Sequence, residues 1–462
     1  MFILVHFIFG LLAMFSAIML PGSCSPYKLS LMSVVIPLLY TVNLIYRLKV
    51  FKIRNFFDYF SLFSVGYIIV FCQIAFMLPF YPELDFYDSL FFKITGMKGI
   101  MLAISGYLFF SGGYIYMLKK KYDSSFREVR VPVNNLKLKL MGYGLSFLSL
   151  SLYGLFLYFD DGSFFVGALS TGGISPYFFI LSSVVMIMAL GLEFYRLKNV
   201  LVSPNTINTL RHFNKVTIVV LIFIFTVQAY AGDRGLILTY VSIILCGYSS
   251  FLNPIGLLRQ AVIIVFGFLF FAIIMQYRGY SDYGRTASRR LDRAFIVVNN
   301  YKWYNFTLEL ASSAKILNVT IESTPSGIPH TKGSLLAYKF VSIVPFVNRY
   351  VNSTTSAQII TNYLFPVNPG KHGAGSSVLG DLFLEFSYYG VLVMALWGAL
   401  VGYIESKSVK KNAFYSIFFY LTICGYAVYL NRSYLLVEIQ PFVWAGVGIY
   451  VLNKLFRLNR PN

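Results

Sequence analysis

The sequence predicts an all-α integral membrane protein with about twelve transmembrane helices and one large outer loop. Hydrophobic residues make up 57% of the 462 residues, whereas charged residues make up only 12%. A soluble protein is about one quarter charged, so this composition indicates a chain that lies mostly in lipid. The apolar residues also gather in segments of roughly 20 residues, the length at which a helix crosses a bilayer.

The first apolar segment begins at the N-terminus and lacks both a charged leading region and a small-residue cleavage site. We therefore expect it to be retained as a span and not removed as a signal peptide. The predicted spans are 2–20, 29–46, 57–79, 96–117, 140–159, 176–194, 216–231, 236–251, 261–276, 383–404, 412–430 and 434–452.

Basic residues occupy alternate links between these spans. The links that alternate with the basic ones are neutral or acidic; the link 82–88, for example, carries Glu83 and Asp85. Basic links face the cytoplasm, so both termini are expected there. The basic residues of these links include Arg47, Lys49, Lys119, Lys120, Arg196, Lys198, Arg259, Lys407, Lys410 and Lys454.

The same distribution accounts for the net charge of +20. A strongly basic protein often binds nucleic acid, but here the charges mark the ends of spans, and no nucleic-acid partner is expected. Cys72, Cys246 and Cys424 lie within spans and Cys24 lies alone outside. This pattern indicates neither a disulfide framework nor a metal site, so we expect no metal and no cofactor.

The longest interruption of the apolar pattern divides the chain into three regions. An N-terminal transmembrane bundle, 1–276, contains nine predicted spans, and a C-terminal region, 378–462, contains three. The alternation of basic links places the intervening loop, 277–377, on the outer side of the membrane.

Five arginines open this outer loop: Arg278, Arg285, Arg289, Arg290 and Arg293. Basic residues are disfavoured outside the membrane next to a span, so this group indicates a function. At helical spacing Arg285, Arg289 and Arg293 share one face, and guanidinium groups bind diphosphates through paired hydrogen bonds. The alternative interpretation is an interfacial helix that holds ordinary lipid headgroups.

Two further places in the outer segments carry candidate residues. Asp233 and Arg234 form a short charged turn between two spans, either as part of a ligand site or as a simple salt-bridged turn. At the exit of the loop, His372 is a candidate base or phosphate partner, or else a solvated surface residue.

The residues that follow the loop predict a helix with a polar start. Ser376 and Ser377 are placed to cap it. Asp381 and Glu385 then fall on one face near the outer surface, where carboxylates are costly unless paired.

These features together resemble the O-antigen polymerase (Wzy) family, which joins oligosaccharide repeat units. The resemblance rests on the twelve spans with one large outer loop and on Arg234-Gly235 opening a span. It also rests on the exit from Pro366 through Gly380-Asp381 to Gly390, followed by a span with Gly398 and Gly402.

The resemblance implies a membrane glycosyltransferase of GT-C-like plan in the bacterial inner membrane. Its donor and acceptor are oligosaccharides on undecaprenyl pyrophosphate, and a chain-length regulator is a possible membrane partner. The family chemistry needs no metal. It assigns Arg234 and the five loop arginines to the diphosphate, and His372, Asp282 or Glu385 to the base near the acceptor hydroxyl.

Two other functions remain open from the sequence. An O-antigen ligase shares the lipid-diphosphate chemistry and a large outer loop. A polysaccharide flippase or other transporter usually shows matched halves and deep charged residues, which this sequence does not display.

Overall fold

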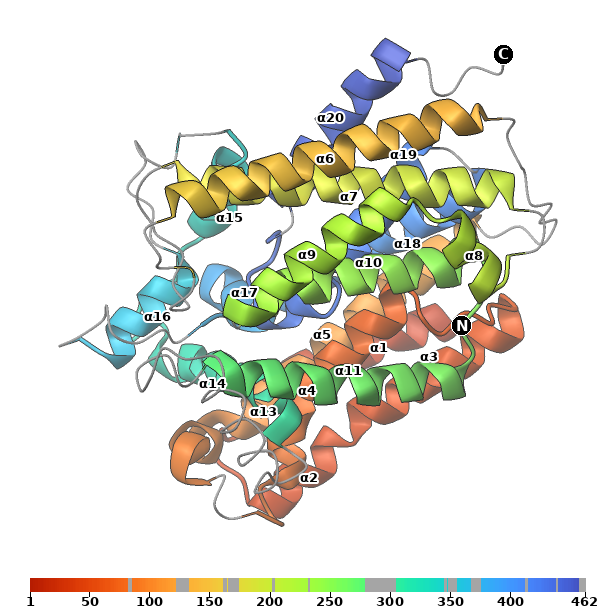
Figure 1. The fold of residues 1–462 in the computed structure, drawn as a ribbon. Coiled ribbons are helices and arrows are strands. Elements are labelled where there is room, and N and C mark those ends of the chain that lie inside the picture. The colour runs from red at the N-terminus through yellow and green to blue at the C-terminus, as the bar shows by residue number, and fades with distance from the viewer. Residues whose placement is uncertain are drawn as a thin grey trace.

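The computed structural model describes residues 1–81, 85–121, 133–160, 164, 174–201, 204–231, 233–278, 305–344, 347, 355–366, 375–411, 414–437 and 439–456. Within these ranges the protein is all-helical and contains no strand, as the sequence predicts (Figure 1). The first eleven helices are α1 (Phe2–Met19), α2 (Pro26–Ser33), α3 (Val35–Val50), α4 (Tyr59–Met77), α5 (Asp85–Lys121), α6 (Asn135–Phe159), α7 (Ser175–Val200), α8 (Thr206–His212), α9 (Lys215–Ala231), α10 (Gly235–Phe251) and α11 (Leu257–Arg278). The later elements are α13 (Asn305–Ala311), α14 (Ala314–Ser323), α15 (Ser334–Val341), α16 (Ser356–Leu364), α17 (Val378–Phe386), η4 (Ser387–Leu392), α18 (Val393–Lys411), α19 (Phe414–Tyr426), η5 (Tyr429–Arg432) and α20 (Ile439–Phe456).

Seven helical segments in the described part of the chain are long and apolar enough to cross a membrane. The number rises to eight if α8 and α9, which meet at 96°, form one span. The helices α10 and α19 are also apolar but shorter. The protein is therefore an integral membrane protein with several candidate spans.

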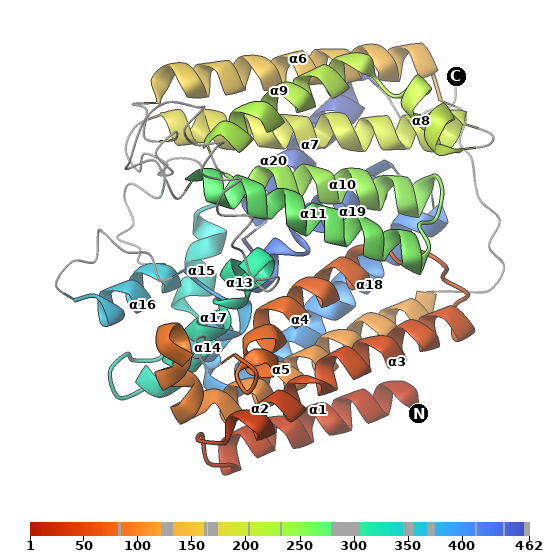
Figure 2. The ribbon, with the colours of Figure 1, turned by 60° about the horizontal axis from the view of Figure 1, so that its bottom comes forward.

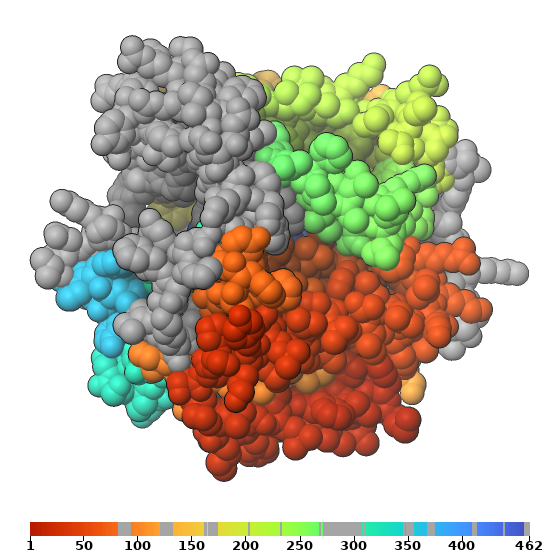
Figure 3. All heavy atoms as spheres, turned by 90° about the horizontal axis from the view of Figure 1, so that it is seen from below, coloured from red at the N-terminus to blue at the C-terminus, as the bar shows by residue number. Residues whose placement is uncertain are grey.

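The long helices form two groups that meet along the middle of the molecule (Figure 2). In one group α5 packs against α1 and α18, and α4 packs against α2. In the other group α7 packs against α6, α19 and α20, and α19 against α10. Contacts between α18 and α19 join the groups. On one face α11 lies between α8–α9 and the first helices of the chain (Figure 3).

The short helices α14, α15 and α16 gather at one end of the bundle, here called the loop end (Figures 1 and 2). The N-terminus lies at the opposite, terminal end (Figure 1). The C-terminal end of α20 also lies there, because Lys137 at the start of α6 donates to the carbonyl oxygen of Phe456. At the loop end Thr95 Oγ1 of α5 donates to the Asn318 carbonyl of α14 at 3.1 Å, so the loop helices pack directly on the bundle.

Glycines allow α5 and α18 to touch backbone to backbone. A Cβ added at Gly398 would lie 2.0 Å from the Phe110 carbonyl oxygen, and one at Gly113 would lie 2.1 Å from that of Ala395. Gly402 meets the Tyr114 carbonyl oxygen in the same way, at 2.6 Å. Small residues at helix interfaces permit such close packing in membranes. The glycines of the predicted tenth span are therefore packing residues.

Two arginines of the basic links are buried and paired. Arg47 is 1% exposed and forms an ion pair with Asp58 at the start of α4. Arg196 is 2% exposed, and its Nη2 lies 2.6 Å from Glu193 Oε1. Arg196 also donates to Asn135 Oδ1 of α6 and to the His212 carbonyl oxygen of α8. An unpaired buried charge is strongly destabilising, so these arginines are retained inside the protein, where they join α3 to α4 and α7 to α6 and α8.

We predict that Gly398→Ala destabilises the protein, whereas Gly144→Ala does not. The methyl group added at position 398 would overlap the Phe110 carbonyl oxygen, and overpacking of this kind costs about 1–3 kcal/mol. A Cβ at Gly144 meets nothing within 4 Å, and alanine is the better helix former by about 1 kcal/mol. Thermal unfolding of both variants in detergent tests this. Equal midpoints would contradict the close α5–α18 contact.

Candidate functional site

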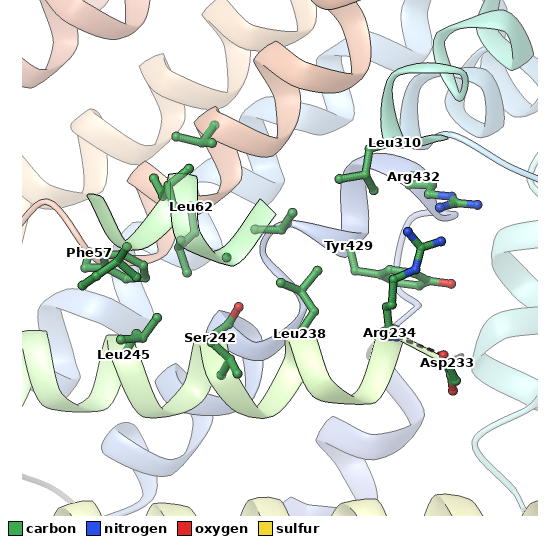
Figure 4. Close-up of a pocket in the computed structure, with 17 residues that line it drawn as sticks. Phe57, Leu62, Asp233, Arg234, Leu238, Ser242, Leu245, Leu310, Tyr429 and Arg432 are labelled. Carbon is green, nitrogen blue, oxygen red and sulfur yellow. Dashed lines mark hydrogen bonds between the residues drawn. The ribbon is translucent and has the colours of Figure 1, made fainter. Parts of the chain in front are cut away.

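The candidate site is a pocket at the boundary between the two helix groups. It has a volume of about 230 Å³. We call it the loop-end pocket (Figure 4). Residues that line it are Phe57, Leu62, Val65, Asp233, Arg234, Gly235, Leu238, Val241, Ser242, Leu245, Ile263, Ile264, Gly267, Leu310, Val428, Tyr429 and Arg432. Most of these side chains are apolar, so the body of a ligand held there would also be apolar.

Polar groups of the loop-end pocket concentrate at one mouth. Arg234 and Arg432 lie next to each other there, with Tyr429 beside them, while Leu238 and Leu245 follow along α10 toward the other end (Figure 4). Both arginines are half-buried. The pocket therefore combines an apolar body with a cationic mouth.

Local hydrogen bonds place Arg234 at the start of α10. The Asp233 backbone N–H donates to the Gln228 carbonyl at 3.0 Å, which closes the turn after α9. Asp233 Oδ1 then accepts from the Gly235 N–H at 3.0 Å, which forms an Asx turn directly before the helix. Arg234 occupies the N-cap position of α10, so its side chain projects from the end of the helix that carries partial positive charge.

A buried asparagine places Arg432. Asn431 is fully buried, and its Nδ2 donates to the Phe63 carbonyl of α4 at 3.1 Å. Gly66 faces this contact, and a Cβ there would lie 2.8 Å from Asn431 Nδ2. The short helix η5 is thus fastened to α4, and the next residue, Arg432, lies at the pocket mouth.

The electrostatics of the mouth favour an anion. Among the described residues that line the pocket, two guanidinium groups contribute positive charge and Asp233 contributes one carboxylate, and the N-terminus of α10 adds partial positive charge. Guanidinium groups bind phosphates with paired, directional hydrogen bonds, and helix N-termini bind phosphates through free N–H groups. The arrangement suits a ligand with an anionic head and an apolar body.

A second polar cluster lies between α15 and α17 at the loop end. Lys339, Asp381 and Glu385 line a cavity of about 20 Å³. Asp381 Oδ1 accepts from Ser376 Oγ at 2.9 Å, and Lys339 Nζ lies 3.1 Å from the centre of the Tyr434 ring. Burial lowers the pKa of Lys339 to about 8, while the nearby Asp381 carboxylate opposes this shift.

Glu385 connects α17 to the loop helix α15. Its Oε1 accepts from the Leu336 N–H in the first turn of α15 at 2.6 Å. A carboxylate at a helix N-terminus satisfies an N–H group that the helix leaves open. Glu385 is 6% exposed, so it serves in this structure as a cap that docks α15.

The structure places the predicted site residues as follows. Ser377 caps α17, with its Oγ accepting from the Gly380 N–H at 3.1 Å, which confirms the predicted cap. Arg234 lies at the pocket mouth, Glu385 lies in the second cluster, and Arg278 is the last residue of α11. The predicted site residues that lie outside the described residues are Asp282, Arg285, Arg289, Arg290, Arg293 and His372.

Sequence reasoning did not single out Arg432. The sequence did contain a signal for it. Arg432 falls in the short link between the last two predicted spans, and the alternation of basic links that places Arg234 on the outer side places this link there too. The described residues contain no group of three His, Cys, Asp or Glu side chains that could hold a metal ion.

Comparisons with protein families, with curated proteins and with solved structures found no match to this chain. The function of this protein is therefore inferred from the geometry and chemistry of the site itself.

We predict that Lys339→Met raises the thermal stability of the protein below pH 8. The folded state holds Lys339 with a pKa of about 8, against 10.5 for an exposed lysine, so folding opposes its charge at neutral pH. Between pH 8 and 10.5 the unfolded chain binds more protons, and the stability of the wild-type protein rises with pH. The advantage of the variant should shrink over that range.

Unfolding midpoints measured from pH 6 to pH 10 test this, with Lys28→Met as the control because Lys28 is exposed. A midpoint difference that does not change with pH would contradict the role assigned to burial of Lys339.

Proposed function

We propose that this protein is a repeat-unit polymerase that joins oligosaccharides carried on undecaprenyl pyrophosphate, as in O-antigen synthesis. The observation that carries the proposal is the pairing of Arg234 and Arg432 at the mouth of an apolar pocket. A polyprenyl diphosphate has this combination of groups, a strongly anionic head on a long hydrocarbon chain.

In the proposed complex the guanidinium groups of Arg234 and Arg432 bind the diphosphate. The apolar wall along α10, with Leu238 and Leu245, receives the first isoprenoid units. Moving hydrocarbon out of water contributes about 25 cal/mol per Å² of buried surface. The isoprenoid chain lies in the lipid bilayer before it binds, so it gains little of this free energy in the pocket. Affinity and orientation therefore come mainly from the charged mouth.

The proposed topology has twelve spans, with both termini in the cytoplasm and residues 277–377 in the periplasm of a bacterial inner membrane. This topology is supported by the position of the N-terminus and of the end of α20 at the terminal end, away from α14, α15 and α16. The loop-end pocket then opens on the periplasmic side, where lipid-linked repeat units are joined.

The proposed reaction transfers one glycosyl group. A terminal hydroxyl of the acceptor oligosaccharide attacks the anomeric carbon of the donor's reducing-end sugar. The bond from that carbon to the diphosphate oxygen breaks, and undecaprenyl pyrophosphate leaves with the electron pair while a base takes the hydroxyl proton. Arginines lower the barrier because negative charge grows on the departing diphosphate.

The loop arginines Arg278, Arg285, Arg289, Arg290 and Arg293 are proposed to complete the diphosphate site. Asp282 and His372 are the candidate bases from the loop. Glu385 is a third candidate: its Oε1 accepts from the Leu336 N–H, so its Oε2, which is buried and has no hydrogen-bond partner among the described residues, is the oxygen that would take the proton. The proposed partners are the two lipid-linked oligosaccharides, the bilayer and a chain-length regulator in the same membrane, without nucleic acid.

Deleting the gene and separating surface lipopolysaccharide on a gel tests the function. A polymerase deletion leaves a single repeat unit on the lipid core, whereas loss of a ligase or a flippase leaves a bare core. A bare core would therefore contradict the proposal, and so would an unchanged ladder.

We predict that Arg234→Gln and Arg432→Gln each reduce polymer about 10- to 100-fold in the deletion strain. Each loses charged hydrogen bonds worth about 1.5–3 kcal/mol. The matched control is Arg54→Gln, an exposed arginine that does not line the pocket, which should restore the full ladder. Protein levels are compared by immunoblot, and a normal ladder from Arg432→Gln would remove Arg432 from the site.

We also predict that Arg289→Ala in the outer loop gives the single-repeat pattern while the protein level holds. The reason is the loss of one guanidinium group from the proposed diphosphate site. A full ladder in this variant would exclude Arg289 from that site.

A further inference from the structure

A second cavity lies at the terminal end, beside the last turns of α10, whereas Arg234 stands at the N-cap of that helix. It has a volume of about 480 Å³ and is bounded by α8, α9, α10 and the start of α11. We call it the terminal-end pocket. Its lining includes Leu221, Phe225 and Ile244, and two more lining residues, Leu210 and Ile222, are 61% and 59% exposed.

The bend between α8 and α9 shapes this cavity. The two helices meet at 96°, so α8 crosses the end of the bundle while α9 runs along it. Thr206 Oγ1 on α8 lies 2.9 Å from the Tyr248 hydroxyl on α10, and Asn253 Nδ2 donates to that hydroxyl at 3.4 Å. These hydrogen bonds hold α8 beside the cavity and put a polar edge on an otherwise apolar space.

The charged residue on the lining of the terminal-end pocket is basic. Arg259 lines it and is exposed, and none of the described residues that line it is acidic. Arg211 at the end of α8 and Lys215 at the start of α9 flank the bend. An exposed cation beside an apolar cavity at a predicted membrane interface matches a lipid whose head is anionic.

We propose that the terminal-end pocket binds an anionic phospholipid of the adjacent leaflet. The acyl chains would fill the space between α9, α10 and α11, and the phosphate would meet Arg259 beside the Thr206–Tyr248–Asn253 edge. Such a lipid would fasten α11, which is mostly exposed along its first half, to the rest of the bundle. This inference does not depend on the proposed polymerase activity.

A polyprenyl chain is the alternative occupant of the terminal-end pocket, because Leu245 and Ile263 line both pockets. A long polyprenyl chain whose head lies at Arg234 could reach this space. The position of Arg259 favours the phospholipid, since a polyprenyl tail carries no charge at its far end.

The experiment uses the purified full-length protein, delipidated in detergent, with dioleoyl phosphatidylglycerol and dioleoyl phosphatidylcholine as probes. Native mass spectrometry measures bound lipid, and thermal unfolding measures its effect. We expect one phosphatidylglycerol to bind about tenfold more tightly than phosphatidylcholine and to raise the unfolding midpoint.

Two variants and a control make the test specific. Arg259→Gln should abolish the preference for phosphatidylglycerol, and Ile222→Trp, which fills the pocket from an exposed position, should weaken binding of both lipids. Arg54→Gln, an exposed arginine that does not line the pocket, should bind as the wild-type protein does.

Equal affinity for the two lipids would overturn the proposal, and so would a full preference for phosphatidylglycerol in Arg259→Gln. A third contrary result would be that undecaprenyl phosphate displaces phosphatidylglycerol from the wild-type protein but not from Arg234→Gln. The last result would assign the space to a polyprenyl tail.

Discussion

The direct contact between the backbones of α5 and α18 is the constraint on which the other packing depends. In a bilayer, apolar side chains gain little by leaving lipid, so helices associate through close packing and hydrogen bonds. Gly113 and Gly398 supply that closeness where the helices cross. Because α17 and η4 lead directly into α18, the contact also sets α17 at the loop end, where α14 packs against it.

Buried polar pairs then determine how the remaining helices join this centre. Arg47 of α3 pairs with Asp58 at the start of α4, and the Tyr114 hydroxyl of α5 donates to Glu405 of α18 at 3.0 Å. Groups such as these are costly in an apolar surrounding unless they are paired. Their pairing selects one arrangement of four helices from several that apolar packing alone would permit.

The loop-end pocket exists because the two helix groups meet there without closing completely. Its lining comes from α4, from α10 and α11, and from η5 in the connection between α19 and α20. No single segment contains the site. Its two arginines, Arg234 and Arg432, are 198 residues apart in the chain. Each is positioned by a short turn with polar hydrogen bonds at the end of a helix.

The membrane class, the helical secondary structure and the start of individual helices follow from the order of the amino acids. Apolar runs near 20 residues predict helices because the backbone must satisfy its own hydrogen bonds in lipid, and Ser377 and Arg234 stand where α17 and α10 begin. These properties are local. The tertiary structure alone decided that Arg432 joins Arg234, that Glu385 caps α15, and that Arg47 is buried in an ion pair. Each of these depends on which helices touch, and hydrophobicity along one helix does not encode its neighbours.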